Sequence, residues 1–200
     1  MKENGNRFKK QKLRRAIFLD RDGTIIKFED LVTKPSQLRL LPRAAETINK
    51  FNKLGFLVIV VTNQPVVARG LITPKGIDDL HEILIKRFKR SKAHIDAFYF
   101  CPHHPEATLK KYRVVCFCRK PSPGMLKQAI KKFNIDPRKS FMIGDSVIDV
   151  VSGKRAGLKT ILVKTGPGHS RLDRIYENKV RPDFKAKNLI EAVKIIKNKC

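Results

Sequence analysis

The chain has 200 residues, 42% of them hydrophobic, and its 44 Lys and Arg outweigh its 18 Asp and Glu to give a formal net charge of +26 at pH 7. This length suits one domain with its own hydrophobic core. No apolar run is long enough to span a membrane, and no signal-peptide core follows the charged residues 1–15. We therefore expect a cytoplasmic protein without a membrane partner, built from a basic, disordered extension (residues 1–15) and one domain (residues 16–200).

The positive charge has two interpretations. It would suit a nucleic-acid partner, because phosphate backbones favour clustered Lys and Arg. The basic residues are spread, however, over the N-terminus, over helix faces such as IKRFKRSK and AIKKFN, and over the final VKIIKNKC, with no interleaved aromatic pattern. This distribution favours solvated basic faces and leaves a nucleic-acid partner as the less favoured interpretation.

Predicted strands and helices alternate along the chain. The strands are short and apolar, and they are expected at residues 16–20, 56–62, 95–100, 140–145 and 158–163. The helices show helical apolar spacing or a cap followed by proline, as at Thr73–Pro74 and Ser122–Pro123, and they are expected at residues 42–55, 73–90, 122–134, 147–157 and 188–198. Such alternation predicts an α/β fold with a doubly wound, mostly parallel sheet.

Four of the predicted strands end in polar residues that suit phosphate chemistry. In chain order they are DRDGT with Asp20 and Asp22, TNQ with Thr62 and Asn63, the end of a cysteine loop (residues 101–121) with Arg119 and Lys120, and GDSVID with Asp145 and Asp149. Functional residues of α/β folds gather where the carboxyl ends of strands open onto loops. One such pair of aspartates could cap a turn, but four polar strand ends in this order favour an active site.

In this order the motifs resemble those of the haloacid dehalogenase-like phosphohydrolases, which read D-x-D-G-T, a Thr at a strand end, a Lys, and G-D-x-x-x-D. The longer stretches AIFLDRDGTI, VVTNQ, YFCPHHP, CFCRKPSPGML and MIGD are similar to the D-glycero-D-manno-heptose 1,7-bisphosphate phosphatases, over about residues 16–165. The resemblance implies a Rossmann-like fold of the haloacid dehalogenase type without a large cap domain. It also implies a Mg²⁺-dependent phosphatase that removes the 7-phosphate from this sugar bisphosphate. Independently of the resemblance, we expect the protein to be a monomer.

The resemblance implies a role for each matching residue. Asp20 would attack phosphorus and form an aspartyl-phosphate, while Asp22 would protonate the leaving oxygen and later activate water. Thr62 and Lys120 would hold the transferring phosphoryl group and neutralise its charge. The implied ligands of Mg²⁺ are the side chains of Asp20 and Asp145 and the main-chain carbonyl of Asp22.

The cysteine loop contains four candidate metal ligands in two pairs. They are the C-x-H pair Cys101 and His103 and the C-x-C pair Cys116 and Cys118. Four such ligands suit the tetrahedral Cys₃His site of a structural zinc ion. A disulfide loop is a poor alternative because three cysteines cannot all pair, and a free-standing zinc finger would need a helix or ribbon of its own. We expect a structural zinc that stiffens the loop and so fixes where Arg119 points.

Substrate contacts are implied for Asn63, Arg119 and Lys120, with Arg119 reaching a second anionic group of the sugar bisphosphate. Three features depart from the heptose enzymes: the sequence of residues 26–42, the proline at Pro65, and Ser146 where many relatives have a lysine. These departures leave a histidinol-phosphate phosphatase as the nearest alternative. A nucleic-acid 3′-phosphatase and a zinc nucleic-acid-binding protein are the alternatives from another functional class.

Overall fold

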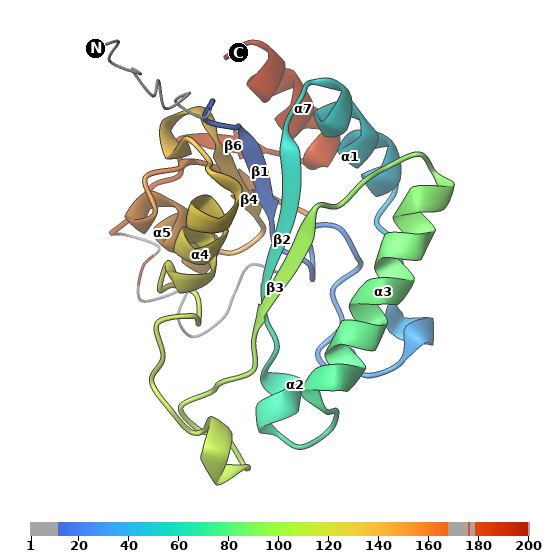
Figure 1. The fold of residues 1–200 in the computed structure, drawn as a ribbon, viewed down its shortest axis with the longest axis vertical. Helices are drawn as coiled ribbons and strands as arrows, with labels where there is room; N and C mark the ends of the chain where they lie inside the picture. Colours follow the sequence, from blue (N-terminus) through green and yellow to red (C-terminus); the bar gives the residue numbers. More distant parts are fainter. Residues whose placement is uncertain (1–11, 168–175, 177–178, 200) are drawn as a thin grey trace, which may run out of the picture.

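The computed structural model describes residues 12–167, 176 and 179–199. Its six strands form one parallel sheet in the order β3-β2-β1-β4-β5-β6 (Figure 1). The strands are β1 (Ala16–Leu19), β2 (Leu57–Asn63), β3 (Ala97–Cys101), β4 (Phe141–Gly144), β5 (Lys159–Val163) and β6 (Phe184–Ala186). The predicted α/β fold with a doubly wound parallel sheet is therefore confirmed.

Helices cover both faces of this sheet (Figure 1). One face carries α1 (Ala44–Lys53), α3 (Pro74–Arg90) and α7 (Leu189–Lys197), and the other carries α4 (Gly124–Phe133) and α5 (Val147–Arg155). The four-residue helix α2 (Pro65–Ala68) follows β2, and short 3₁₀ turns lie at Pro35–Gln37, Lys110–Tyr112 and Pro137–Lys139. Successive side chains of a strand point to opposite faces, so β1 contributes Ile17 and Leu19 to one core and Ala16 and Phe18 to the other.

The predicted N-terminal cap is confirmed for one helix and is wrong for another. Helix α3 has the predicted cap, in which Thr73 Oγ1 accepts a hydrogen bond from the Gly76 amide at 3.0 Å. Helix α4 begins at Gly124 with Pro123 at its N-cap, and not with a Ser122 cap as predicted. The Gly124 amide instead donates to the Phe117 carbonyl at 2.9 Å, which ties the start of α4 to the cysteine loop.

One feature at the edge of the domain was not predicted. Strand β6 has only three residues and lies in a basic segment without an apolar run; Asp183, just before it, accepts hydrogen bonds from the amide and hydroxyl of Thr160 at 2.8 and 2.7 Å.

Residues 1–11 of the expected extension lie outside the described residues. Within the described part of this extension, Arg14 and Arg15 hydrogen-bond to Asn134 and Leu54 of the domain. Among the described residues, no helix has the length and apolar character needed to cross a membrane.

Candidate active site

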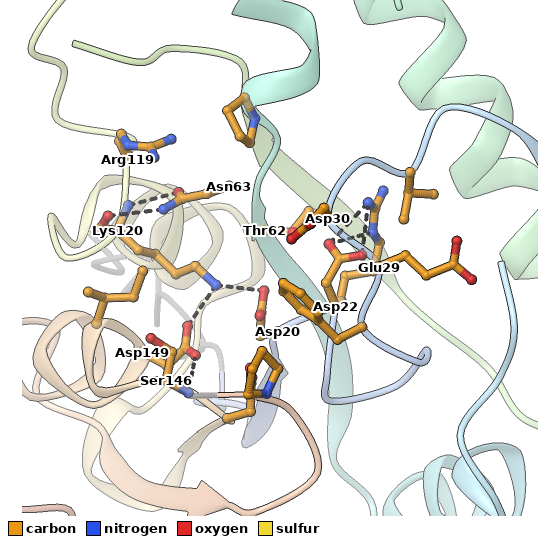
Figure 2. Close-up of a pocket in the computed structure, with 17 residues that line it drawn as sticks. Asp20, Asp22, Glu29, Asp30, Thr62, Asn63, Arg119, Lys120, Ser146 and Asp149 are labelled. Atoms are coloured by element: carbon orange, nitrogen blue, oxygen red, sulfur yellow. Dashed lines mark hydrogen bonds and ion pairs between the residues drawn. The ribbon is translucent and has the colours of Figure 1, made fainter. Parts of the chain in front are cut away.

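A pocket of about 500 Å³ opens at the carboxyl ends of β1, β2 and β4 (Figure 2). The residues that the sequence assigned to chemistry and substrate binding all line it: Asp20, Asp22, Thr62, Asn63, Arg119, Lys120 and Asp145. Neighbouring parallel strands end at the same edge of the sheet, and this topology brings together residues more than 100 positions apart. The four candidate zinc ligands are not part of the lining.

The first loop approaches the pocket through a glycine turn. Asp20 follows β1 directly, and its amide donates to the Ile143 carbonyl of β4 at 3.0 Å. Gly23 has a φ of +75°, a left-handed conformation that side chains disfavour, and a Cβ there would lie 2.6 Å from Asp145 Oδ2. The backbone of Gly166 lies against the same carboxylate. The two glycines therefore let backbone close around Asp145.

Lys120 brings a buried positive charge next to Asp20. Its side chain is 3% exposed, and its Nζ atom lies 2.6 Å from Asp20 Oδ1 and 2.7 Å from Asp149 Oδ1. It also donates to the Val61 carbonyl at 3.0 Å. Burial alone would lower the pKa of Lys120, but the carboxylates of Asp149 and Asp20 outweigh burial and raise it. Lys120 is therefore an ammonium ion held in place by three acceptors.

Asn63 fixes the backbone of the same lysine. Its Nδ2 donates to the Lys120 carbonyl and its Oδ1 accepts from the Lys120 amide, both at 3.0 Å (Figure 2). The expected substrate-binding residue thus uses both ends of its amide to anchor the end of the cysteine loop. Thr62, one residue earlier in β2, is buried, and its hydroxyl accepts from Gln64 Nε2 at 2.9 Å.

Three carboxylates converge in the pocket, and two of them, Asp20 and Asp149, contact the Lys120 ammonium. Asp20, Asp145 and Asp149 each bring an oxygen within 4.8 Å of the others. Burial, and then the charge of Asp20, raise the pKa of Asp145 to about 8. Burial likewise raises the pKa of Asp149 to about 7, although Lys120 opposes this. The cluster has more negative charge than Lys120 neutralises, so its hard oxygen donors fit a divalent cation such as Mg²⁺.

Asp22 lies on the opposite side of Asp20 from Lys120 (Figure 2). Its carboxylate pairs with Arg21 at 3.0 Å and accepts from Gln64 Nε2 at 2.8 Å. Neither Arg21 nor Gln64 was predicted from the sequence to belong to the site. The available signal was a charged residue placed between two aspartates in a loop that leaves a buried strand.

The four candidate zinc ligands also come together. The Sγ atoms of the three cysteines lie 3.1–3.5 Å apart, and His103 Nδ1 lies 3.6 Å from Cys101 Sγ and 3.3 Å from Cys118 Sγ. A tetrahedron with zinc–sulfur bonds of about 2.3 Å and zinc–nitrogen bonds of about 2.0 Å has edges of roughly 3.5–3.8 Å. Cys101, Cys116 and Cys118 are all free thiols. The donor types fit a tetrahedral zinc ion, and the sulfur–sulfur distances are a few tenths of an ångström shorter than the edges of such a tetrahedron.

Arg119 connects this cluster to the pocket. Its Nη1 donates to the carbonyl of His103 at 2.9 Å, and the residue is partly buried. Figure 2 shows Arg119 on the Lys120 side of the pocket, away from Asp22, Glu29 and Asp30. The pocket therefore has a cationic side next to the cysteine loop and an acidic side next to the first loop.

Comparisons with known proteins agree with this geometry. Residues 117–192 match the sequence model of the HAD-hydrolase-like family. The chain is 38% identical over 185 residues to the D-glycero-D-manno-heptose-1,7-bisphosphate 7-phosphatase of Chlorobaculum tepidum, covering 90% of this chain and 92% of that one. It is 42% identical over 155 residues to the D-glycero-β-D-manno-heptose-1,7-bisphosphate 7-phosphatase of Pasteurella multocida, covering 77% and 84%.

A solved structure gives the same result for the fold. The D,D-heptose 1,7-bisphosphate phosphatase of B. bronchiseptica, crystallised with magnesium and phosphate, superposes with a TM-score of 0.80 at 26% identity and covers 93% of this chain and 99% of that one. The similarity thus extends over the whole domain and not over the motifs alone. The chain belongs to the haloacid dehalogenase-like phosphatases, in the group that contains these heptose bisphosphate phosphatases.

Proposed function

We propose that this phosphatase removes the 7-phosphate from D-glycero-D-manno-heptose 1,7-bisphosphate. The relatives named above carry this activity in their names, and they match the chain over most of its length. The observation that carries the proposal is the Asp20 carboxylate at the pocket, 2.6 Å from a buried Lys120 ammonium. This arrangement places an anionic nucleophile beside the positive charge that a dianionic phosphate requires.

In the first half of the reaction, an oxygen of Asp20 attacks phosphorus. The phosphorus–oxygen ester bond breaks, its electron pair goes to the sugar oxygen, and Asp22 gives that oxygen a proton. In the second half, Asp22 takes a proton from water as the water oxygen attacks phosphorus, and inorganic phosphate and free Asp20 result. Thr62 holds a phosphoryl oxygen, while Lys120 offsets the charge that builds up beside Asp20.

Magnesium would be held by the carboxylates of Asp20 and Asp145 and by the main-chain carbonyl of Asp22. When bound, it supplies Lewis-acid stabilisation of the phosphoryl oxygens. The converging carboxylates described above support this assignment, and the structure of the B. bronchiseptica relative contains magnesium. Asp149 is not needed as a ligand, because its ion pair keeps the ammonium of Lys120 in place.

The affinity for Mg²⁺ should rise with pH. Asp145 has a pKa of about 8 in the folded protein, well above the ordinary value, so below pH 8 a proton occupies the ligand oxygen and must leave. We expect Mg²⁺ to bind about 50-fold more weakly at pH 6 than at pH 8, measured by titration calorimetry. Asp145→Asn is the control and should bind Mg²⁺ weakly at both values. Equal wild-type affinity at pH 6 and pH 8 would contradict the assignment.

The same shift has a consequence for stability without added Mg²⁺. A carboxyl group with a raised folded-state pKa favours folding at low pH, below its unfolded pKa, and this stabilisation is lost as the pH rises through about 8. Mg²⁺ should therefore raise the melting temperature more at pH 8 than at pH 6.

We further propose that zinc in the Cys₃His cluster holds the cysteine loop. Zinc would join Cys101 at the end of β3 to Cys116 and Cys118, and Arg119 and Lys120 follow directly. Thiolate ligands are stable in a reducing compartment, which supports a cytoplasmic location. We also propose that residues 16–200 form a single phosphatase domain that acts as a monomer, which is supported by the pocket, because this chain supplies every residue that the proposed chemistry uses.

Cys116→Ser should lower zinc content and activity together. The wild type should contain about one zinc per chain, and the variant much less, because a serine hydroxyl is a poor zinc ligand. Activity should fall at least tenfold, since a loosened loop moves Arg119 and Lys120. Elemental analysis and phosphate release measure the two effects. Normal activity in a zinc-free variant would rule out the structural role.

Arg119 is proposed to bind the phosphate that remains on the sugar. A bisphosphate brings a second anionic group, which a guanidinium can bind with two parallel hydrogen bonds. Its tether to His103 keeps Arg119 at the cationic side of the pocket. The acidic side, with Glu29 and Asp30, would repel the same group.

Arg119→Ala should therefore act selectively on the bisphosphate. We expect kcat/KM for heptose 1,7-bisphosphate to fall by an amount that corresponds to about 2–3 kcal/mol of lost transition-state stabilisation. A small generic monophosphate has no second phosphate, so its hydrolysis should change much less. Initial-rate measurements on both substrates test this expectation. Equal losses would assign Arg119 to the chemical step and weaken the bisphosphate proposal.

A further inference from the structure

Arg21 is a fully buried arginine next to the reacting groups that the mechanism above does not use. It lies between Asp20 and Asp22, and its exposed fraction is 0%. Its guanidinium donates to both oxygens of Asp22, from Nε at 3.1 Å and from Nη2 at 3.2 Å. Nη2 also donates to Gln64 Oε1 at 2.8 Å, and Nη1 lies 3.3 Å from His81 Nε2. A buried charge bound this completely has one well-defined position.

Gln64 closes the network on the other side of Asp22. It follows β2, and its backbone N–H donates to the carbonyl of Cys101 at 2.8 Å, so its backbone is fixed to β3. Its Nε2 donates to Asp22 Oδ2 at 2.8 Å and to Thr62 Oγ1 at 2.9 Å. Asp22 Oδ2 therefore accepts hydrogen bonds from both Arg21 and Gln64. Asp22 Oδ1 accepts one from Arg21, and at 3.2 Å it is the longest of the hydrogen bonds to this carboxylate.

His81 supports Arg21 from helix α3. The ring is 3% exposed, stacks on Phe98 at 4.4 Å between ring centroids, and meets Phe100 edge-on. A guanidinium can only donate hydrogen bonds, so His81 Nε2 must be the acceptor and the ring proton must be on Nδ1. Burial and the charge of Arg21 lower the pKa of His81 to about 3, so the ring is neutral at working pH.

We propose that Arg21, held by Gln64 and His81, is a positioning residue that makes Asp22 Oδ1 the proton-transferring oxygen. A carboxylate on a single bond can exchange its two oxygens by rotation. Here Oδ2 faces two donors, so a proton on Oδ2 would meet other hydrogens, while Oδ1 can carry one. Asp22 is partly exposed and lines the pocket, so its carboxyl group can meet the substrate. This inference rests on the proposed acid–base role of Asp22.

The leaving group of the substrate distinguishes a positioning role from a structural one. Release of a sugar alkoxide needs a proton from Asp22, whereas 4-nitrophenolate leaves without one. Arg21→Lys replaces the planar fork by a point charge, and we expect kcat on heptose 1,7-bisphosphate to fall roughly 100-fold with KM within about twofold of wild type. The first turnover of 4-nitrophenyl phosphate should slow by less than about threefold. Hydrolysis of the aspartyl-phosphate intermediate should then be slow.

Two variants at His81 provide a matched pair if Arg21→Lys does not fold. His81→Gln keeps an acceptor near the place of Nε2, and His81→Leu removes it. We expect His81→Leu to lower kcat on the bisphosphate about tenfold and His81→Gln to restore most of it, with melting curves showing both folded. Equal kcat losses in the two variants, or equal losses in the first turnover of both substrates, would overturn the proposal.

Failure of the proposed function is distinguishable from failure of this inference. If the wild-type enzyme does not hydrolyse the heptose bisphosphate but hydrolyses another sugar phosphate, only the substrate assignment is refuted. The comparison of alkyl and aryl esters then proceeds with that sugar phosphate, and it still decides whether Arg21 acts through Asp22.

Discussion

Asp20→Asn should reduce steady-state phosphatase turnover by at least about 10⁴-fold while the protein stays folded. An amide oxygen is too weak a nucleophile to form the acyl phosphate on which both halves of the reaction depend. Lys120 keeps its contacts with Asp149 and Val61 in this variant, so we expect the free energy of unfolding to change by less than about 1 kcal/mol. Phosphate release and chemical denaturation provide the two measurements.

Asp22→Asn is the matched control for this experiment. It also changes one aspartate of the first loop to an amide, but it leaves the nucleophile intact. With 4-nitrophenyl phosphate it should still give one fast release of nitrophenolate per enzyme, whereas Asp20→Asn should give none. Substantial turnover by Asp20→Asn would place the nucleophile at another residue.

Lys120→Met should damage both stability and catalysis. The side chains have similar length, but the thioether leaves Asp20 and Asp149 buried without their shared ammonium. Removing one member of a buried ion pair costs about 3–5 kcal/mol in the free energy of unfolding. Turnover should fall at least about 10³-fold, because the charge beside the transferring phosphoryl group is lost.

A double variant separates these two effects. Asp149→Asn added to Lys120→Met removes one of the stranded carboxylates, and it should recover about half or more of the lost stability. It should recover no activity, since the ammonium next to Asp20 is still missing. Recovery of activity together with stability would mean that Lys120 serves only to hold the fold together.

The sequence predicted the fold and most of the pocket because both depend on local patterns. Short apolar runs such as AIFLD and FLVIVVT predict buried parallel strands, and the topology then places their carboxyl ends side by side. This is why Asp20, Thr62, Lys120 and Asp145 meet as expected. The spacing of Cys101, His103, Cys116 and Cys118 likewise predicted a cluster whose atoms the structure brings within 4.8 Å of one another.

The remainder depends on contacts that a pattern does not encode. His81 is one polar position on the apolar face of α3, and nothing local shows that it meets Arg21, which lies 60 residues earlier. Asn63 was expected to bind substrate, and the sequence did not show that its amide also bonds to the backbone of Lys120, 57 residues away. Strand β6 has only three residues and is defined by its pairing with β5, so the sequence carries no local signal for it.

Ser146 illustrates the limit of reading a single motif position. Many relatives were expected to have a lysine there that contacts substrate. In this chain Ser146 lines the pocket, and its amide donates to Asp149 Oδ2 at 3.2 Å at the start of α5. The backbone of this residue therefore supports Asp149, and Arg119 is the residue that we propose for binding a second phosphate.

The most direct test of the proposed function compares kcat/KM for D-glycero-D-manno-heptose 1,7-bisphosphate and for histidinol phosphate, with Mg²⁺ present and zinc retained. The cationic side of the pocket at Arg119 predicts that the bisphosphate is the better substrate by at least about tenfold, and that the 7-phosphate is released. Equal or better turnover of histidinol phosphate would contradict the heptose assignment.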